Sequence, residues 1–378
     1  MTDWDVVVVG AGPAGAAAAI ELAGQGASVL LLDRTRFPRW KVCGACLSPG
    51  ALSLLDALGL EGVPTRLGAG PLARLVLGSR AGTVHLALEG SMAISRAALD
   101  LALVRAAERA GAAFWQGARA TLGRAEADAR VLRVLRDRVE VDVDARVVID
   151  ATGLGRGLDE DGRATSASRP RARVGIGAEL DEPAYPVGRG ELHMVVGRAG
   201  YVGLVRVEGG TLNVAAAVDP GALRTATPLE VANDILAEAG RPALTKAATH
   251  GWRGTPSLMR APGEVGGERL FRLGDAAGYA EPFTGEGIGW ALGDGRSVAT
   301  LAARALDGWH DDLLVEWRTY RRERRRISER LCRALAWALR RPWMVDAAFA
   351  SLRMAPTLAG PFVRRAGRAP EPIGALLA

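Results

Sequence analysis

A glycine-rich turn near the N-terminus is the residue pattern with the clearest chemistry in this chain. The segment Val6-Val-Val-Val-Gly10-Ala-Gly12-Pro-Ala-Gly15 is typical of a buried strand, a tight turn and the start of a helix. Gly10 permits the turn, Gly12 lets the backbone approach a phosphate, and Gly15 lets the helix pack close to the strand. Because a helix N-terminus carries partial positive charge, the pattern predicts a binding site for a dinucleotide pyrophosphate.

An acidic residue at the end of the next strand supports this prediction. Asp33 ends the apolar run Val29-Leu-Leu-Leu-Asp33 and lies 18 residues after Gly15. A carboxylate in that place can accept hydrogen bonds from the ribose of an adenosine. We therefore expect the first 33 residues to form a β-α-β unit that holds the adenosine half of a dinucleotide.

Two later segments favour a flavin dinucleotide over a nicotinamide one. One apolar strand ends at Asp150 and runs into the turn Ala-Thr-Gly153, and the short strand Leu270-Phe-Arg-Leu ends at Gly274-Asp275. A simple nicotinamide dehydrogenase needs neither segment. We expect Asp275, at the end of its strand, to bind the ribityl chain of FAD.

The turn Gly285-Glu286-Gly287-Ile288 precedes a helix that the pattern extends to about Leu306. Its backbone N–H groups and the helix N-terminus would face the pyrimidine edge of the flavin. Since reduced flavin carries its negative charge at that edge, the helix dipole would favour reduction.

With these motifs the chain resembles the flavoprotein superfamily of p-hydroxybenzoate hydroxylase, and within it the geranylgeranyl reductase group. The resemblance covers roughly residues 5 to 330 and includes Phe37-Pro-Arg-Trp-Lys41-Val-Cys43-Gly44-Ala-Cys46-Leu-Ser-Pro49. The Gly-Asp-Ala-Ala-Gly and Gly-Glu-Gly-Ile runs match the group as well, whereas typical aromatic hydroxylases have Gln and Asn in place of Glu286 and Ile288.

The resemblance implies roles for particular residues. Cys43 would be a small wall beside the isoalloxazine, and Arg96 would contact the ribityl and phosphate groups, where its guanidinium can fork onto oxygen atoms. The candidate cofactor-binding residues are Gly10, Gly12, Ala14, Gly15, Asp33, Arg34, Lys41, Cys43, Gly44, Arg96, Asp150, Gly153, Gly274, Asp275, Pro282, Gly285, Glu286, Gly287 and Ile288. The candidate catalytic or pocket-wall residues are Cys43, Tyr201 and Gly203. The four histidines have no metal-ligand spacing, and no metal is expected.

One departure from the geranylgeranyl reductase group concerns the substrate. Members of that group carry a motif like Tyr-x-Trp-x-Phe-Pro where this chain reads Tyr201-Val-Gly203-Leu-Val205-Arg206. Gly203 in place of an indole leaves room beside the flavin and removes an aromatic contact. This difference favours a bulkier or more rigid substrate than a polyprenyl chain.

Three functions follow from these residues. The first is an FAD-dependent monooxygenase that uses NAD(P)H and O2 on a hydrophobic aromatic, polyketide-like or lipid-like metabolite of secondary metabolism, and Gly203 favours it. The second is a flavin-dependent C=C reductase of a polyprenyl lipid, which Cys43 and the Gly-Glu-Gly-Ile turn favour. The third is a non-catalytic flavin or lipid carrier. The Trp-x-Trp-x-Ile-Pro signature of flavin halogenases is absent from the sequence.

The cysteine pair Cys43-Gly-Ala-Cys46 allows two interpretations. It could be a redox dithiol that passes electrons to the flavin, or the two residues could be packing residues. Dithiol flavoenzymes of that kind usually carry a second GxGxxG for NAD(P)H, and Gly175-Ile-Gly177-Ala-Glu-Leu180 lacks the third glycine. The sequence therefore favours packing residues.

Charge is concentrated near the C-terminus. The formal net charge is +6, but residues 318–368 hold fourteen arginines against three acidic residues, a local net charge of +11. We expect a helical cap with a solvated basic face, with a peripheral membrane or lipid contact as the alternative. No nucleic-acid-reading motif accompanies the arginines. No signal peptide is visible and no apolar run reaches about 18 residues, so a cytoplasmic protein is expected.

The remaining patterns define the fold class, α/β, with a Rossmann-type FAD-binding domain and a β-meander. We expect that domain to be discontinuous, over residues 1–70, 92–170 and 262–308. An antiparallel substrate-binding sheet would interleave with it over residues 71–91 and 171–261, and residues 309–378 would form a helical basic region with breaks at Pro342, Pro356 and Pro361.

Overall fold

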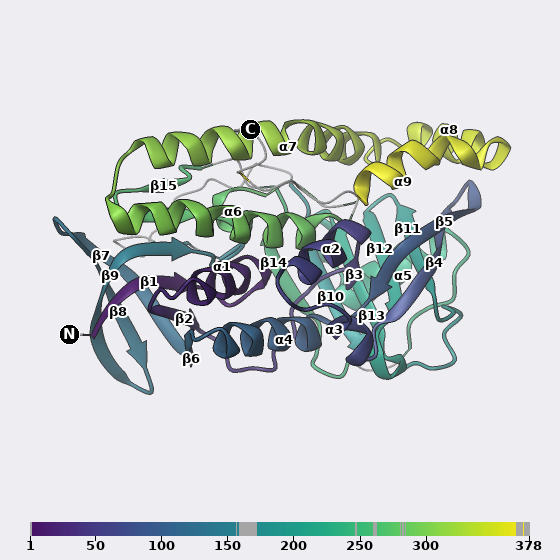
Figure 1. The fold of residues 1–378 in the computed structure, drawn as a ribbon. Coiled ribbons are helices and arrows are strands. Elements are labelled where there is room, and N and C mark those ends of the chain that lie inside the picture. The colour runs from purple at the N-terminus through teal and green to yellow at the C-terminus, as the bar shows by residue number, and fades with distance from the viewer. Residues whose placement is uncertain are drawn as a thin grey trace.

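Two sheets and a layer of helices make up the protein (Figure 1). The computed structural model describes residues 2–155, 157–158, 172–245, 248–259, 263–279, 281, 283, 285–367 and 373. Within them, the mixed α/β class and the Rossmann-type arrangement that the sequence predicted are confirmed.

The first sheet is parallel at its centre. Its strand order is β15 (Gly266–Gly267), β16 (Leu270–Arg272), β9 (Val139–Asp150), β1 (Thr2–Val9), β2 (Val29–Asp33) and β6 (Ala113–Gln116). All neighbours in this order run parallel except β15 and β16. Residues 6–9 of β1, 29–32 of β2 and 147–149 of β9 are buried on both faces, so these stretches read as continuous apolar runs. The first half of β9, which pairs with β8, is exposed and alternates instead.

An antiparallel meander covers one face of this sheet. It consists of β7 (Ala118–Ala125), β8 (Arg130–Arg136) and β9. Asp137 and Arg138 join β8 to β9 with positive φ angles of 48° and 68°, as a tight hairpin turn requires. The meander that the sequence predicted at this place is confirmed.

Helices cover the other face. α1 (Pro13–Gly24) lies between α4 (Arg96–Arg109) and α6 (Gly287–Asp307), and α7 (Asp312–Ala338) runs beside α6 (Figure 1). Ser95 caps α4 by accepting from the Ala98 N–H at 3.1 Å. The alanine-rich faces of α1 and α6 pack on the sheet in one buried cluster.

The second sheet is mostly antiparallel. Its order is β14 (Arg253–Ser257), β10 (Val174–Leu180), β13 (Leu212–Val218), β12 (Gly200–Arg206), β11 (Glu191–Gly197), β4 (Gly70–Ser79), β5 (Gly82–Ala93) and β3 (Cys46–Leu47). Only β11 and β4 pair in parallel among these strands as described. Helix α5 (Pro228–Glu238) packs on its outer face. Helices α2 (Pro49–Ala57) and α3 (Val63–Arg66) lie in the connection between β3 and β4.

The C-terminal region is helical, as the sequence indicated. It continues from α7 into α8 (Pro342–Met354), the 3-10 turn η4 (Pro356–Ala359) and α9 (Gly360–Ala366). Pro342 and Pro356 open α8 and η4. Pro361 likewise lies in the first turn of α9, where a missing N–H costs nothing, so the predicted breaks at all three prolines are confirmed.

The two sheets follow the division of the chain that the sequence suggested, with β3 as an addition to the second sheet. The division into domains itself stays a prediction. Within the described residues, no helix combines the length and the apolar character needed to cross a membrane.

Close packing between α1 and α6 yields a first prediction. A Cβ atom on Gly295 would lie 2.2 Å from the Ala14 carbonyl oxygen, whereas a Cβ atom on Gly24 would meet nothing within 4 Å. We expect Gly295→Ala to lower the free energy of unfolding by about 1–3 kcal/mol. The control Gly24→Ala should raise it by about 0.4–1 kcal/mol. Urea denaturation of both variants measures this, and equal effects would contradict the packing argument.

Candidate functional site

A cavity of about 800 Å³ opens at the N-terminus of α1 and extends between the two sheets. Most of the residues that the sequence singled out meet on its wall. They are Gly12, Ala14, Lys41, Cys43, Gly44, Arg96, Gly153, Tyr201, Gly203, Gly274, Asp275, Gly285, Gly287 and Ile288.

Gly10 and Gly15 do not line the cavity themselves, but they shape the turn between β1 and α1. Gly10 has a φ of 109°, and a Cβ atom on it would lie 2.3 Å from the Ala151 carbonyl oxygen. A Cβ atom on Gly15 would lie 2.0 Å from the Gly10 carbonyl oxygen. Both positions therefore need glycine for packing, and together they bring the first turn of α1 to the cavity.

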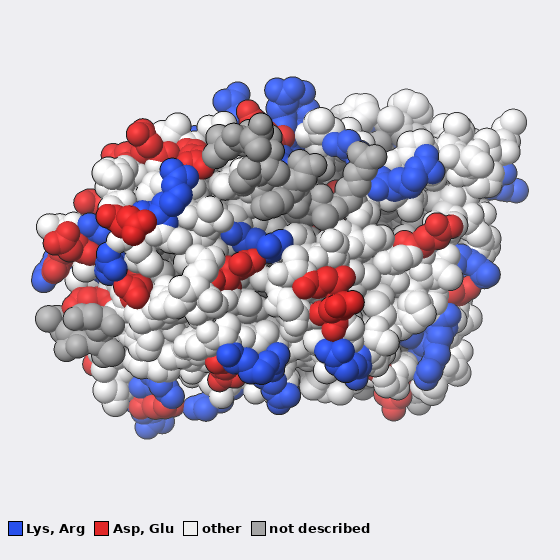
Figure 2. Space-filling model, in the orientation of Figure 1, with Lys and Arg blue, Asp and Glu red and all other residues white. Residues whose placement is uncertain are grey.

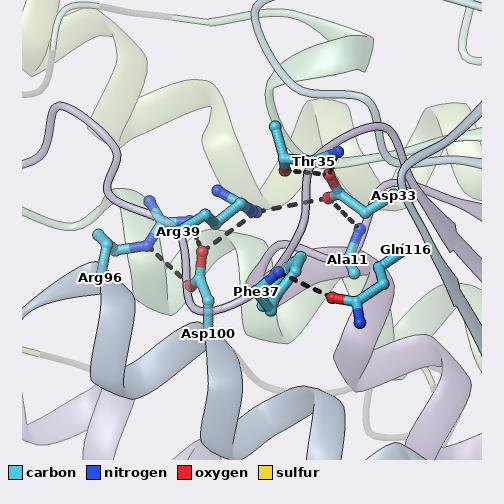
Figure 3. Close-up of polar contacts among 8 residues, drawn as sticks. All are labelled: Ala11, Asp33, Thr35, Phe37, Arg39, Arg96, Asp100 and Gln116. Carbon is cyan, nitrogen blue, oxygen red and sulfur yellow. Dashed lines mark hydrogen bonds and ion pairs between the residues drawn. The ribbon is translucent and has the colours of Figure 1, made fainter.

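Two arginines face that first turn. The Arg96 guanidinium binds the buried Asp100 carboxylate with two hydrogen bonds of 2.8 Å, and an Arg39 nitrogen lies 3.1 Å from the same carboxylate (Figure 3). Burial disfavours the charge of Arg96, but Asp100 and Cys43 together outweigh burial and raise its pKa. Asp100 thus holds two permanent cations in place.

These cations lie at the expected pyrophosphate site. The Cβ direction of Gly12 points to nitrogen atoms of Arg39 and Arg96, each 3.7 Å away. Gly12 is the N-cap of α1 and gives the helix no side-chain cap. A buried Arg39 nitrogen, Nε, has no hydrogen-bond partner among the described residues. An open helix N-terminus flanked by two oriented guanidiniums fits the pyrophosphate of FAD.

Arg39 was missed by the sequence interpretation, which chose its neighbour Arg34. Arg34 is exposed and lies away from the cavity wall. Asp33 accepts the Ala11 N–H at 3.0 Å and the Thr35 N–H at 2.9 Å, beside Arg39 (Figure 3). Its ribose contact stays a prediction, and in the structure Asp33 fixes the turn after β2.

The part of the cavity where the sequence predicts the flavin is formed by the 3-10 turn η3 (Gly274–Ala277) and the start of α6. Asp275 faces the cavity, where its charge partly offsets the lowering of the Lys41 pKa by burial and by Arg96. The Lys41 ammonium lies near Gly153, whose Cβ direction it approaches to 3.4 Å. One part of the cavity is thus lined by the positively charged Lys41, the negatively charged Asp275 and the start of α6.

Asp150 and Glu286 have other surroundings. Asp150 is fully buried, and its carboxylate accepts from the N–H groups of Thr152 and Leu158, both at 3.1 Å. This places it in the turn that follows β9 rather than on the cavity wall. Glu286 is buried at the N-cap position of α6. Pro282 lies outside the described residues.

A buried charge cluster supports η3 from behind. Asp294 in α6 accepts the Gly274 N–H at 3.0 Å and binds Arg321 and Arg325 of α7. Both arginines also reach carbonyl oxygens at the two ends of η3, those of Gly274 and Gly278. Burial, and then repulsion from Arg325, lowers the pKa of Arg321 to about 10.

This cluster corrects one expectation. The basic C-terminal region is not entirely a solvated face, because these two arginines are buried and hold the flavin-side turn. The sequence contained a signal for them. The buried stripe of α7 includes Leu313, Trp317 and Tyr320, and both arginines occupy positions on that stripe.

The wall opposite the flavin motifs comes from the second sheet. Tyr201 lines it with its ring 5.0 Å from that of Phe283, edge to face. Burial raises the pKa of Tyr201 well above its usual value, and a hydrogen bond to Glu281 raises it further. Glu281 in turn pairs with the fully buried Arg173 at 3.1 Å. Tyr201 is therefore a neutral and firmly anchored part of the wall.

Gly203 lies next to Tyr201 on this wall, but the space beside it is not empty. It pairs with Met194 across β11 and β12, and a Cβ atom on Gly203 would lie 3.1 Å from the Met194 sulfur. Met194 also lines the cavity. A flexible thioether thus occupies space that the sequence interpretation left for a bulky substrate.

The two cysteines of the Cys-Gly-Ala-Cys segment are free thiols on the cavity wall. Burial, with a smaller contribution from Cys43, raises the pKa of the Cys46 thiol to about 12. Cys46 therefore stays protonated near neutral pH and is a poor nucleophile. Cys43 has different surroundings, because the Arg96 guanidinium interacts with it electrostatically.

The last part of the wall comes from the C-terminal region, which the sequence interpretation did not place at the site. Residues of η4 and α9 close the cavity on the side of β4 and β5, among them Thr357, Ala359 and Phe362. No pattern in the sequence connects this segment to the flavin motifs, which lie more than 60 residues earlier.

A Rossmann-type sheet with a phosphate-binding turn, two oriented arginines and a second sheet over the cavity defines a flavoprotein. Residues 3–173 match the family model described as FAD binding domain. A menaquinone reductase of Mycobacterium tuberculosis is 30% identical over 333 residues, which cover 80% of this chain and 76% of that protein. The chain belongs to this FAD-binding family of the p-hydroxybenzoate hydroxylase superfamily and is an FAD-dependent oxidoreductase.

Other relatives show how varied the family is. A rifampicin monooxygenase of Rhodococcus hoagii is 26% identical over 86% of this chain and 68% of that protein. Among solved structures, a flavin-dependent brominase superposes with a TM-score of 0.78 at 18% identity, over 96% of this chain and 94% of that one. A geranylgeranyl bacteriochlorophyll reductase-like protein from Thermoplasma acidophilum superposes with a TM-score of 0.68 at 20% identity, over 86% and 84%.

The position of Arg39 yields a second prediction. Arg39→Ala should raise the Kd for FAD about tenfold to a hundredfold, because it removes a charge-assisted contact to phosphate. Titration of FAD into the apoprotein, followed by flavin fluorescence, measures this. The control is Arg36→Ala, since Arg36 is exposed and pairs with Asp137 at 3.0 Å outside the cavity. Unchanged FAD affinity in the Arg39 variant would remove Arg39 from the phosphate site.

Proposed function

We propose that this flavoprotein reduces a carbon–carbon double bond in a hydrophobic isoprenoid lipid, with an isoprenoid quinone as the first candidate substrate. The observation that carries the proposal is the aliphatic wall of the cavity. The side chains that β4, β5 and β11 contribute to it include Leu75, Leu77, Leu86, Leu88, Leu192 and Met194. Such a surface excludes water and fits a hydrocarbon chain.

Two further observations support reduction. The relative that is 30% identical over most of this chain carries the name menaquinone reductase. In addition, Met194 fills space beside Gly203, so the departure from the prenyl reductase motif is no longer a reason to favour oxygenation.

Different residues of the chain would hold different parts of FAD. Arg39, Arg96 and the first turn of α1 would hold the phosphates, and Asp275 with the start of α6 would fix the flavin. Bound FAD supplies the two-electron reductant, for which we propose NAD(P)H as the source. The chain must then supply a proton to the second carbon of the reduced bond.

Cys43 is the group that we propose for this proton. Its thiol lines the cavity beside the Arg96 guanidinium, so it can face a substrate held there. Tyr201 is less suited, because its hydroxyl is hydrogen-bonded to Glu281 and its pKa is raised.

Monooxygenation is the second candidate function, and the rifampicin monooxygenase relative favours it. An anaerobic single turnover distinguishes the two. We expect chemically reduced enzyme to be reoxidised by menaquinone without O2 and to yield a product that keeps two more hydrogens in its isoprenoid chain after its ring has been oxidised back to the quinone. If reoxidation requires O2 and labelled O2 enters the product, the protein is a monooxygenase and the reductase proposal is wrong.

The role of Cys43 yields a third prediction. Cys43→Ser should slow substrate-dependent reoxidation of the flavin about a hundredfold, the usual scale for loss of a general acid. Flavin reduction by dithionite should be unchanged. Cys46→Ser is the matched control and should stay within a few fold of wild type, because the protonated Cys46 thiol takes no part. Equal losses in both variants would instead support a redox dithiol.

A further inference from the structure

Helix α8 is apolar on two opposite faces. Val345 and Phe349 are buried in the cluster that includes Val84 and Leu86 of β5. The other face carries Trp343, Ala347, Ala350 and Met354 at helical spacing, and all four are exposed. Only one of the two apolar faces is buried, so the outer face of α8 lacks a covering surface within the described residues.

Further exposed apolar side chains lie on the segments that precede and follow α8. Trp337 at the end of α7 is 52% exposed, Trp343 66%, Met354 88% and Leu358 in η4 63%. We call these four residues, with Ala347 and Ala350, the α8 patch. Exposed apolar residues of this size mark an interaction site when they gather on one part of a surface.

Positive charge is in excess in the segment that carries the α8 patch. Residues 331–367 contain six arginines and one acidic residue, Asp346, which forms an ion pair with Arg80. Two of the six, Arg333 and Arg340, form ion pairs with Glu329 and Asp219. Arg341 stacks on the Trp337 ring at 3.6 Å. In Figure 2 the upper right part of the molecule, where Figure 1 places α8 and α9, is largely white, with separate blue side chains beside it.

The exposed apolar side chains and the excess of positive charge together indicate what kind of surface would cover the α8 patch. Tryptophan prefers the boundary between hydrocarbon and water, and arginine binds anionic headgroups while its stem lies along apolar surface. A second copy of the chain would bring the same excess of positive charge toward the patch, so like charges would repel across such a contact. An anionic lipid surface complements both the apolar side chains and the charge.

We propose that the α8 patch docks on the surface of a membrane that contains anionic lipids. Trp343, Met354 and Leu358 insert at the headgroup level, and the arginines around them bind lipid phosphates. The patch is continuous with the cavity, because Thr357 and Ala359 on either side of Leu358 line the cavity wall. The docked surface therefore lies next to the substrate cavity, although the proposal itself does not depend on which reaction takes place there.

Vesicle sedimentation of the FAD-loaded full-length chain tests this proposal. We expect binding to vesicles of phosphatidylcholine mixed with phosphatidylglycerol, weaker binding to phosphatidylcholine alone, and release at high salt. Trp343→Ser combined with Met354→Ser should weaken partitioning about tenfold or more, because it removes the most exposed apolar area.

The matched control replaces exposed apolar residues elsewhere. Leu135 and Val139 flank the hairpin turn between β8 and β9 and are 45% and 61% exposed. Leu135→Ser combined with Val139→Ser should bind vesicles like wild type. The flavin spectrum and thermal unfolding of both double variants confirm that they are folded.

Three results would overturn the proposal. The first is an absence of binding to the anionic vesicles, and the second is equal binding by wild type and the Trp343/Met354 variant. The third is a mass of two chains by light scattering that the Trp343/Met354 variant loses, because the patch would then be an interface between copies.

Discussion

The close approach of backbone to backbone around α1 is the constraint on which the nucleotide site depends. Gly15 lets α1 contact the turn at Gly10, and Gly295 lets α6 contact α1 at Ala14. A side chain at any of these places would push the first turn of α1 away from Arg39 and Arg96. The distance between the N-terminus of α1 and the guanidiniums of Arg39 and Arg96 therefore depends on the absence of side chains at these glycines.

The sequence was sufficient for those parts of the structure in which local patterns and packing agree. The β-α-β unit and the β-meander follow from periodicity and turn residues, and tertiary contacts reinforce them. The flavin motifs were found for the same reason, because glycine turns and strand-end acids have fixed spacing along the chain.

The rest depends on contacts between distant segments. Arg39 lies in a stretch without periodicity, so only the folded chain shows that Asp100 orients it toward Gly12. Arg321 and Arg325 belong to a basic run that resembles a solvated face, until the partner Asp294 on another helix is known. Met194 and Gly203 are neighbours on adjacent strands. Their pairing depends on the strand register and not on their separation in the sequence.

The segments that follow α6 have two different structural roles. α7 supports the flavin-side turn through its buried arginines, whereas η4 and α9 form a wall of the cavity. The junction between them falls near Pro342, after every buried arginine of α7. Exchanging the chain beyond that junction between relatives would replace one wall of the substrate cavity as a module. The residues that form the nucleotide site would stay unchanged in such an exchange. The family thus has a simple evolutionary route to new substrates.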